Sequence, residues 1–233
     1  MSHAGEHGCH DDVCSRIIGS LGRRCDEERN VLALNVLLLG RRQSGRSSVG
    51  NALIGGEEFQ TRPYLSGVST TTECKLLSRT FRNFFRRQGA ESDLLLRVLD
   101  TPQLTLRPHT LHQLCPEGVH VLVLIIRADQ SHEDAHLEEQ AQSLLGQDWR
   151  RHSLLVLTFT DHLKKAGLQP SDYLALSPDW LKALTEEVEG GAFFMDNSCD
   201  WASIRGGPLR ERLLRLSARN HHKALTVQTE VSL

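Results

Sequence analysis

The sequence predicts an α/β protein in which a mostly parallel six-stranded sheet, with one antiparallel edge strand, carries helices on both faces. Apolar runs of strand length recur along the chain, and amphipathic patterns with helical spacing lie between them. Strands that are apolar along their whole length are typical of a parallel sheet buried on both faces. The six predicted strands are residues 31–39, 74–85, 94–99, 119–126, 154–159 and 192–195.

The strands follow from local sequence signals. Residues 31–39 form a nearly continuous apolar run that ends at Gly40, which is typical of a central strand. Residues 74–85 lie next to 94–99 in the sequence, so we expect the two to form a hairpin that supplies the antiparallel edge. The remaining three runs are separated by helical patterns, as expected for parallel strands joined by crossovers.

Three helices follow from capping and periodicity. Ser131 can cap a helix over residues 132–145, and Gly146 stops it. Pro178 at the first helical position opens a helix over 179–188, and Pro208 opens a third helix. Their apolar faces are, in turn, Leu137, Ala141, Leu144 and Leu145; Leu181, Leu184 and Val188; and Leu209, Leu213, Leu214 and Leu216.

Composition narrows the function classes. The net charge is −2 and charged residues make up 24%, so electrostatic binding of nucleic acid is not expected. No apolar run approaches the ~20 residues of a membrane span, and the amino-terminal residues do not resemble an export signal. The six scattered cysteines are then expected to be reduced, and we expect a cytoplasmic protein. Residues 1–29 and 220–233 are predicted to be tails around a domain at 30–219.

The first predicted strand runs directly into a candidate phosphate loop. Residues 40–48 match the template G-x-x-x-x-G-K-[ST] except that Arg46 replaces the lysine. Such a loop wraps its main-chain N–H groups around phosphates, and a hydroxyl at Ser47 would bind Mg²⁺. The alternative is a strand-to-helix turn without a ligand, which the flanking strand makes less favourable. The predicted nucleotide-binding residues here are Gly40, Arg41, Gln43, Ser44, Gly45, Arg46, Ser47 and Ser48.

Arg46 changes the expected chemistry. An arginine is bulkier and more forked than a lysine, so the exchange is not conservative in a tight site. Its positive charge is retained, so phosphate binding can survive in weakened form. Hydrolysis should suffer more, because the charge must lie where negative charge develops.

Residues 37–55 resemble the opening of the GIMAP family, the GTPases of immunity-associated proteins with an AIG-type G domain. The pair Gly50-Asn51, followed by Leu53-Ile54-Gly55, is typical of that family and is not general to phosphate loops. The resemblance extends roughly over residues 31–219. It implies a Ras-like P-loop G domain that binds GTP or GDP with Mg²⁺. It also implies a switch or scaffold that forms homodimers or oligomers across the nucleotide face.

Two further segments resemble family motifs around the metal. Residues 69–74 resemble switch I, which makes Thr71 a candidate Mg²⁺ and γ-phosphate sensor; a plain polar loop is an equally good explanation. Asp100-Thr101-Pro102 resembles the second phosphate motif, which implies that Asp100 acts on Mg²⁺ through water. The motif's glycine is replaced by Gln103.

The base-recognition motif matches least well. Residues 158–163 resemble the family's Thr-His/Arg-Lys-x-Asp segment. If Leu163 sets the register, His162 fills the position of the base-binding aspartate; a shift by one residue would use Asp161 instead. A carboxylate can accept two hydrogen bonds from guanine, whereas neutral histidine cannot. The resemblance also implies that Asn197 contacts the base.

Two functions remain open from the sequence. The first is a guanine-nucleotide-binding protein with weak or absent GTP hydrolysis, since no general base is evident. The second is a pseudo-GTPase that keeps the fold, binds no nucleotide and acts as a protein-interaction module. The replacements at Arg46, Gln103 and His162 motivate the second.

Overall fold

The computed structural model describes residues 30–59, 74–87, 90–101, 106–129, 135–197 and 202–228. Its centre is a six-stranded sheet with the order β2-β3-β1-β4-β5-β6. The β2–β3 pair is antiparallel and every other neighbouring pair is parallel. The predicted sheet is therefore confirmed. The strands are β1 Asn30–Gly40, β2 Lys75–Arg87, β3 Ala90–Asp100, β4 Val121–Arg127, β5 Ser153–Thr158 and β6 Ala192–Phe194.

β1 is central, as its apolar run predicts. Val36 lies opposite Val98 of β3 and opposite Val121 of β4. β3 begins earlier than predicted because its antiparallel ladder with β2 continues back to the pair Arg87 and Ala90. β4 begins later than predicted because Val119 pairs instead with Leu225, in an isolated antiparallel bridge.

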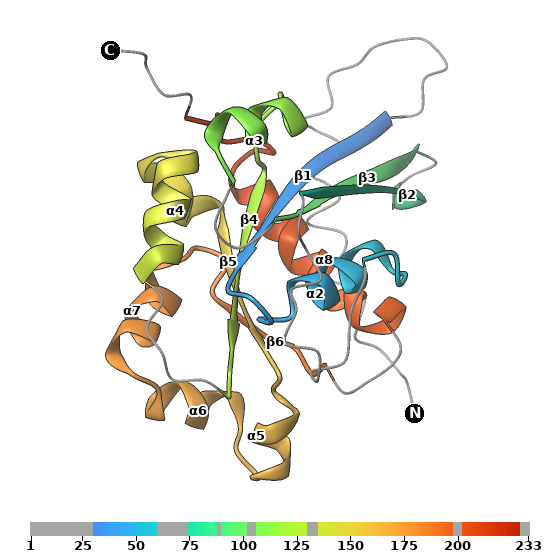
Figure 1. The fold of residues 1–233 in the computed structure, drawn as a ribbon. Coiled ribbons are helices and arrows are strands. Elements are labelled where there is room, and N and C mark those ends of the chain that lie inside the picture. Colours follow the sequence, from blue (N-terminus) through green and yellow to red (C-terminus); the bar gives the residue numbers. More distant parts are fainter. Residues whose placement is uncertain are drawn as a thin grey trace, which may run out of the picture.

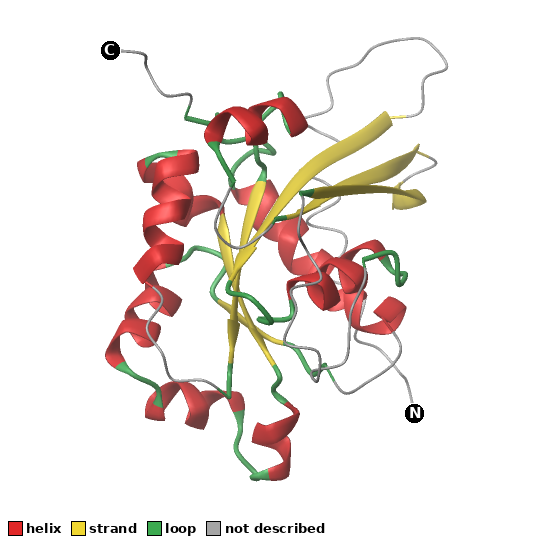
Figure 2. Ribbon diagram, viewed as in Figure 1, coloured by secondary structure: helices red, strands yellow, loops and turns green. Residues whose placement is uncertain are grey.

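Helices cover both faces of the sheet (Figures 1 and 2). On one face α2 and α8 pack on a core that includes Val49, Leu53, Leu209 and Leu213. On the other face α3, α4 and α7 pack on a second core. The helices are α2 Arg46–Ile54, α3 Pro108–Leu114, α4 Ala135–Leu145, α5 Asp161–Lys165, α6 Pro170–Leu176, α7 Asp179–Glu187 and α8 Ala202–Arg219, with a 3₁₀ helix at Gln147–His152.

The predicted apolar faces of the helices are buried, but one predicted helix start is wrong. Pro208 lies inside α8, which already begins at Ala202. Gly206, two residues before the proline, lies so close to α2 that a methyl group there would overlap the carbonyl of Ala52. The turn before Pro208 thus packs against α2, which favours helix where the proline alone predicts a boundary. Pro178 also lies one position earlier than predicted, at the N-cap of α7.

Two arginines from different elements hold the carboxyl end of α2. Arg79 of β2 donates to the carbonyls of Ile54 and Gly55, both at 2.9 Å. Arg210 of α8 donates to the carbonyls of Ala52 and Leu53, at 2.9 and 3.1 Å. Positive charge at this end of a helix is favourable, because the terminal carbonyls are partly negative. We call this pair of guanidiniums the α2 bracket. It fixes the carboxyl end of the helix that begins at the candidate phosphate loop.

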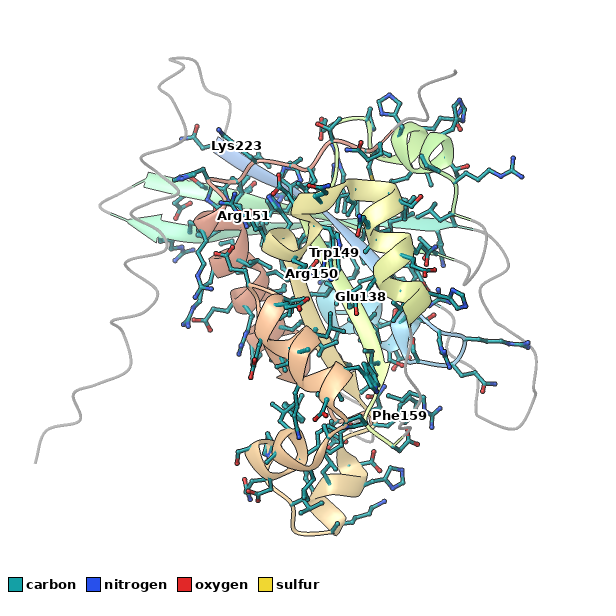
Figure 3. All side chains as sticks on the ribbon, turned by 90° about the vertical axis from the view of Figure 1, so that its left-hand side faces the viewer. Glu138, Trp149, Arg150, Arg151, Phe159 and Lys223 are labelled. Atoms are coloured by element: carbon teal, nitrogen blue, oxygen red, sulfur yellow. The ribbon has the colours of Figure 1, made fainter. Side chains whose placement is uncertain are left out.

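A third arginine ties α4 to α7 (Figure 3). Arg150 stacks over the Trp149 ring with its guanidinium carbon 4.4 Å from the ring centroid. It donates to Glu138 of α4 at 2.5 Å and to Glu187 of α7 at 2.7 Å. Trp149 is fully buried, so its ring packs in the core.

The residues after α8 pack on the domain. Leu225 pairs with Val119, the amide of Gln228 donates to the carbonyl of Leu144 at 2.8 Å, and Val227 is buried. Residues 220–228 therefore cover the sheet end opposite the phosphate loop, where Figure 3 shows Lys223 far from Phe159. Within the described residues, no helix combines the length and the apolar character that crossing a membrane requires.

Candidate nucleotide-binding site

The candidate phosphate loop connects β1 to α2 at the carboxyl end of the central strand. A Cβ atom on Gly40 would lie 2.6 Å from both the carbonyl oxygen of Ile125 and the hydroxyl of Ser44. Gly45 has a φ of 90°, and a Cβ atom there would lie 3.1 Å from Nδ2 of the Asn197 side chain. Both glycines are therefore required by space or by backbone conformation. The loop has the shape that the sequence template predicts.

The amino end of α2 is open to a ligand. Its N-cap is Gly45, no side-chain hydrogen bond caps the helix, and its first turn contains no acidic residue. The Ser44 hydroxyl is buried beside it and lacks a hydrogen-bond partner among the described residues. Free N–H groups at a helix end attract anions, and a buried hydroxyl without a partner is energetically unfavourable. The residues present therefore fit a phosphate group.

The side chain of Arg46 contacts the residues at the end of β3. Its Nη1 donates to the carbonyl of Thr101, and its Nε lies 3.7 Å from Oδ1 of Asp100. Only 6% of its side chain is exposed. Burial lowers the pKa of the Arg46 guanidinium, and the Asp100 carboxylate opposes that change. The guanidinium thus lies beside Asp100, the predicted metal ligand.

Two predicted metal ligands come together in the fold. Ser47 Oγ donates to Oδ2 of Asp100 at 2.8 Å. Thr101, next to Asp100, donates its hydroxyl to the carbonyl of Leu38 at 3.0 Å and so holds β3 against β1. The described residues include no group of three or more His, Cys, Asp or Glu side chains around one metal position. A hydroxyl and one carboxylate suit Mg²⁺ when phosphates supply further ligands.

The base side of the site is built from the ends of β5 and β6. Thr158 Oγ1 donates to the carbonyl of Ser44 at 2.6 Å, which ties β5 to the phosphate loop. The amide of Phe159 donates to Oδ1 of Asn197 at 3.1 Å. Asn197 therefore lies beside the loop, in the region where the sequence predicts a base contact. The contact of Thr158 with Ser44 joins positions that lie far apart in the sequence, so no local pattern marks it.

Asp161 and His162 are adjacent at the start of α5. Asp161 has 17% of its side chain exposed and lies 3.4 Å from Lys165 one turn later. His162 has 58% of its side chain exposed and lies 4.0 Å from Asp161. Asp161 is thus engaged within α5, whereas His162 is open to solvent. The base-recognition position at His162, or at Asp161 after a shift by one residue, stays a prediction.

Arg127, at the end of β4, is a further residue of this region. Its Nε and Nη2 donate to the two carboxylate oxygens of Asp129 at 2.8 and 2.6 Å. Its guanidinium carbon lies 4.0 Å from the centroid of the Phe159 ring. These hydrogen bonds hold the pKa of Asp129 below its usual value. Only 6% of Arg127 is exposed, so this residue belongs to the interior of the site region and not to an exposed surface.

Some sequence predictions lie outside the described residues, namely Thr71, Gln103, the helix cap at Ser131 and the tail at residues 1–29. The remaining predicted site residues are described. Gly40, Arg41, Gln43, Ser44, Gly45, Arg46, Ser47 and Ser48 form the loop and the first turn of α2.

The sheet order, the glycine loop at the end of the central strand and the helix that follows define a P-loop protein with the G-domain fold. The sequence model of the AIG1 family matches residues 34–205. The chain belongs to the AIG1 family, and the predicted relationship to GIMAP-type proteins is confirmed.

Similar sequences come from plants and animals. Immune-associated nucleotide-binding protein 12 of Arabidopsis thaliana is 29% identical over 193 residues, which are 78% of this chain and 46% of that protein. GTPase IMAP family member 8 of Homo sapiens is 28% identical over 176 residues, 70% of this chain and 24% of that protein. The chain thus matches less than half of either relative.

Among solved structures, Toc33 from Arabidopsis thaliana shares the fold. The structure of Toc33 with GDP and Mg²⁺ has a TM-score of 0.53 and 20% sequence identity, and covers 93% of this chain and 96% of that one. Its structure with Mg²⁺ and GMPPNP has a TM-score of 0.52, also at 20% identity. At this identity the likeness concerns the fold.

Proposed function

We propose that this protein binds GTP or GDP together with Mg²⁺ at the loop between β1 and α2 and acts as a switch or scaffold. The uncapped amino end of α2, behind a loop in which Gly40 and Gly45 admit no side chain, carries this proposal. The names of its relatives and the ligands of Toc33 agree with it. Guanine preference rests on family membership and on the position of Asn197.

The residues would divide the work as follows. Main-chain N–H groups of the loop and the first turn of α2 would surround the phosphates. Ser47 and Asp100 would hold Mg²⁺, which neutralises phosphate charge when bound. The Ser44 hydroxyl would gain the partner that it lacks among the described residues. Asn197 would lie against the base.

Hydrolysis is expected to be slow or absent. Catalysis of phosphoryl transfer depends on positive charge placed where negative charge develops. The Arg46 guanidinium instead contacts the carbonyl of Thr101 and lies near Asp100. The described residues of the loop include no acidic side chain that could serve as a base.

The second candidate function is a pseudo-GTPase that works only through protein contacts. The position of Arg46 favours it, because its buried charge already lies 3.7 Å from the carboxylate that would serve Mg²⁺. An internal cation at this position would compete with the metal for Asp100. Binding of nucleotide then requires Arg46 to move or to share the carboxylate.

Replacing Arg46 by lysine separates the two functions. We expect the natural protein to bind fluorescent GTP in the presence of Mg²⁺, and Arg46→Lys to bind it about tenfold more tightly, as one improved charge-assisted contact would give. The measurement is a fluorescence titration with and without Mg²⁺. The matched control is Arg82→Lys, an exposed arginine of β2, which should leave affinity unchanged.

The outcomes distinguish the candidates. No binding by the natural protein up to millimolar nucleotide would end the nucleotide proposal. If binding then arises only in Arg46→Lys, the pseudo-GTPase explanation is correct. We also predict that the protein forms a homodimer or oligomer across the nucleotide face and that it is cytoplasmic. Size-exclusion chromatography with and without GTP tests the first of these predictions.

A further inference from the structure

Two residues beside the candidate site have backbone conformations that residues other than glycine rarely adopt. Gln43 in the phosphate loop has a φ of 62°, and Phe159 after β5 has a φ of 57°. A positive φ is unfavourable for most residues, and for a bulky ring such as Phe159 it is an outlier. Such conformations persist only where surrounding contacts hold them.

Arg127 contacts both of these residues. Its Nη1 donates to the carbonyl oxygen of Gln43 at 3.3 Å. Its guanidinium carbon stacks 4.0 Å from the centroid of the Phe159 ring. One side chain from the end of β4 therefore joins the phosphate side of the site to the base side. Figure 3 shows Phe159 at the sheet end far from Lys223.

The guanidinium of Arg127 is fixed in orientation. Asp129 accepts two of its N–H groups at 2.8 and 2.6 Å, a forked geometry that defines the plane of the group. The side chain is only 6% exposed, whereas Asp129 is 24% exposed. A buried arginine that already makes two hydrogen bonds loses little further conformational freedom when it makes additional contacts.

We propose that Arg127 is a positioning residue that holds the phosphate loop at Gln43, and the turn at Phe159, in the conformation that binds nucleotide. This inference rests on the proposed function of the loop. Thr158 ties the same two segments through the carbonyl of Ser44. Arg127 differs from Thr158 because it touches both strained residues directly. Its removal should release strain and lower the population of the binding conformation.

Arg127→Met tests the proposal, because methionine keeps an unbranched stem and loses every N–H group. Arg150→Met is the matched control: Arg150 also stacks on an aromatic ring and pairs with two carboxylates, but it lies between α4 and α7. Both variants should lower the midpoint of urea unfolding. Only Arg127→Met should raise the dissociation constant for fluorescent GDP, by about tenfold. Arg127→Lys, which keeps the charge without the fork, should fall between.

A second readout works without nucleotide. The amide of Ser44 donates to the carbonyl of Arg41 at 3.1 Å, so its hydrogen exchange reports on the loop. Exchange of this amide should be about tenfold faster in Arg127→Met than in Arg150→Met. Unchanged exchange and affinity in Arg127→Met would overturn the inference. If the natural protein binds no nucleotide, the proposed function fails, and exchange alone then decides whether Arg127 holds the loop.

Discussion

The phosphate side and the base side of the site are built in different ways. The phosphate side comes from consecutive residues, 40–48, joined by Asp100, and Ser44, Arg46 and Asp100 are all buried. The base side is assembled from the ends of three strands through Arg127, Thr158 and Asn197, while His162 is exposed. The residues of the phosphate side are thus given by one contiguous motif, to which Arg127 and Thr158 add contacts from distant strands. The base side depends on the arrangement of the whole sheet.

The largest effect is expected from a substitution on the phosphate side of the site. Gly40→Ala would place a methyl group 2.6 Å from the carbonyl of Ile125 and from the Ser44 hydroxyl. We expect loss of measurable nucleotide binding and a fall of about 1–3 kcal/mol in the free energy of unfolding. Nucleotide titration and urea denaturation measure the two. Gly207→Ala is the control, since a Cβ atom there meets nothing within 4 Å.

The next effect concerns the metal. Ser47→Ala removes the hydroxyl that lies 2.8 Å from Asp100. We expect affinity for GTP with Mg²⁺ to fall about 10- to 100-fold, and affinity measured in excess chelator to change little. Isothermal titration calorimetry with Mg²⁺ and with EDTA gives both values. An equal loss under the two conditions would show that Ser47 acts on the loop and not on the metal.

A smaller effect is expected from a substitution on the base side of the site. His162→Asp would add a carboxylate at an exposed position that the sequence register assigns to base recognition. Since guanine can donate two hydrogen bonds to a carboxylate, we expect about tenfold tighter binding of GTP and no gain for ATP. Competition between the two nucleotides measures the preference. Should Asp161→Asn weaken GTP binding while His162→Asp does nothing, the base position belongs to Asp161.

The smallest expected effect on the site comes from the opposite end of the sheet. Burial lowers the pKa of His120 to about 4, and its Nδ1 accepts the amide of Asn35 at 3.0 Å. The unfolded chain takes up this proton near pH 6.5, so stability should fall as the pH decreases from about 6.5 to about 4. His120→Gln should reduce this fall and leave nucleotide affinity unchanged. Urea unfolding at several pH values is the measurement; an identical pH dependence in the variant would contradict it.

The sequence predicts the sheet well because buried strands carry their signal in every residue. The short helices α5 and α6 escaped prediction because neither buries a residue that would mark a periodic face. Pro208 misled the prediction because the packing of Gly206 against Ala52 is a contact between distant segments.

The same distinction applies to the site. The glycine loop can be recognised from the spacing of its residues in the sequence, and Asp100 from its place after a buried strand. The contact of Thr158 with Ser44 spans 114 positions, and that of Arg127 with Gln43 spans 84. No local pattern reports such a contact, so the residues that hold the loop became evident only from the fold.

The α2 bracket gives the loop a mechanical link to the far side of the molecule. α2 has nine residues and is therefore about 13 Å long. With its rear carbonyls bound by Arg79 and Arg210, the helix cannot slide along its own axis without breaking hydrogen bonds to two other elements. We therefore expect a displacement of α8 or of the β2–β3 hairpin to reach the candidate phosphate loop through α2.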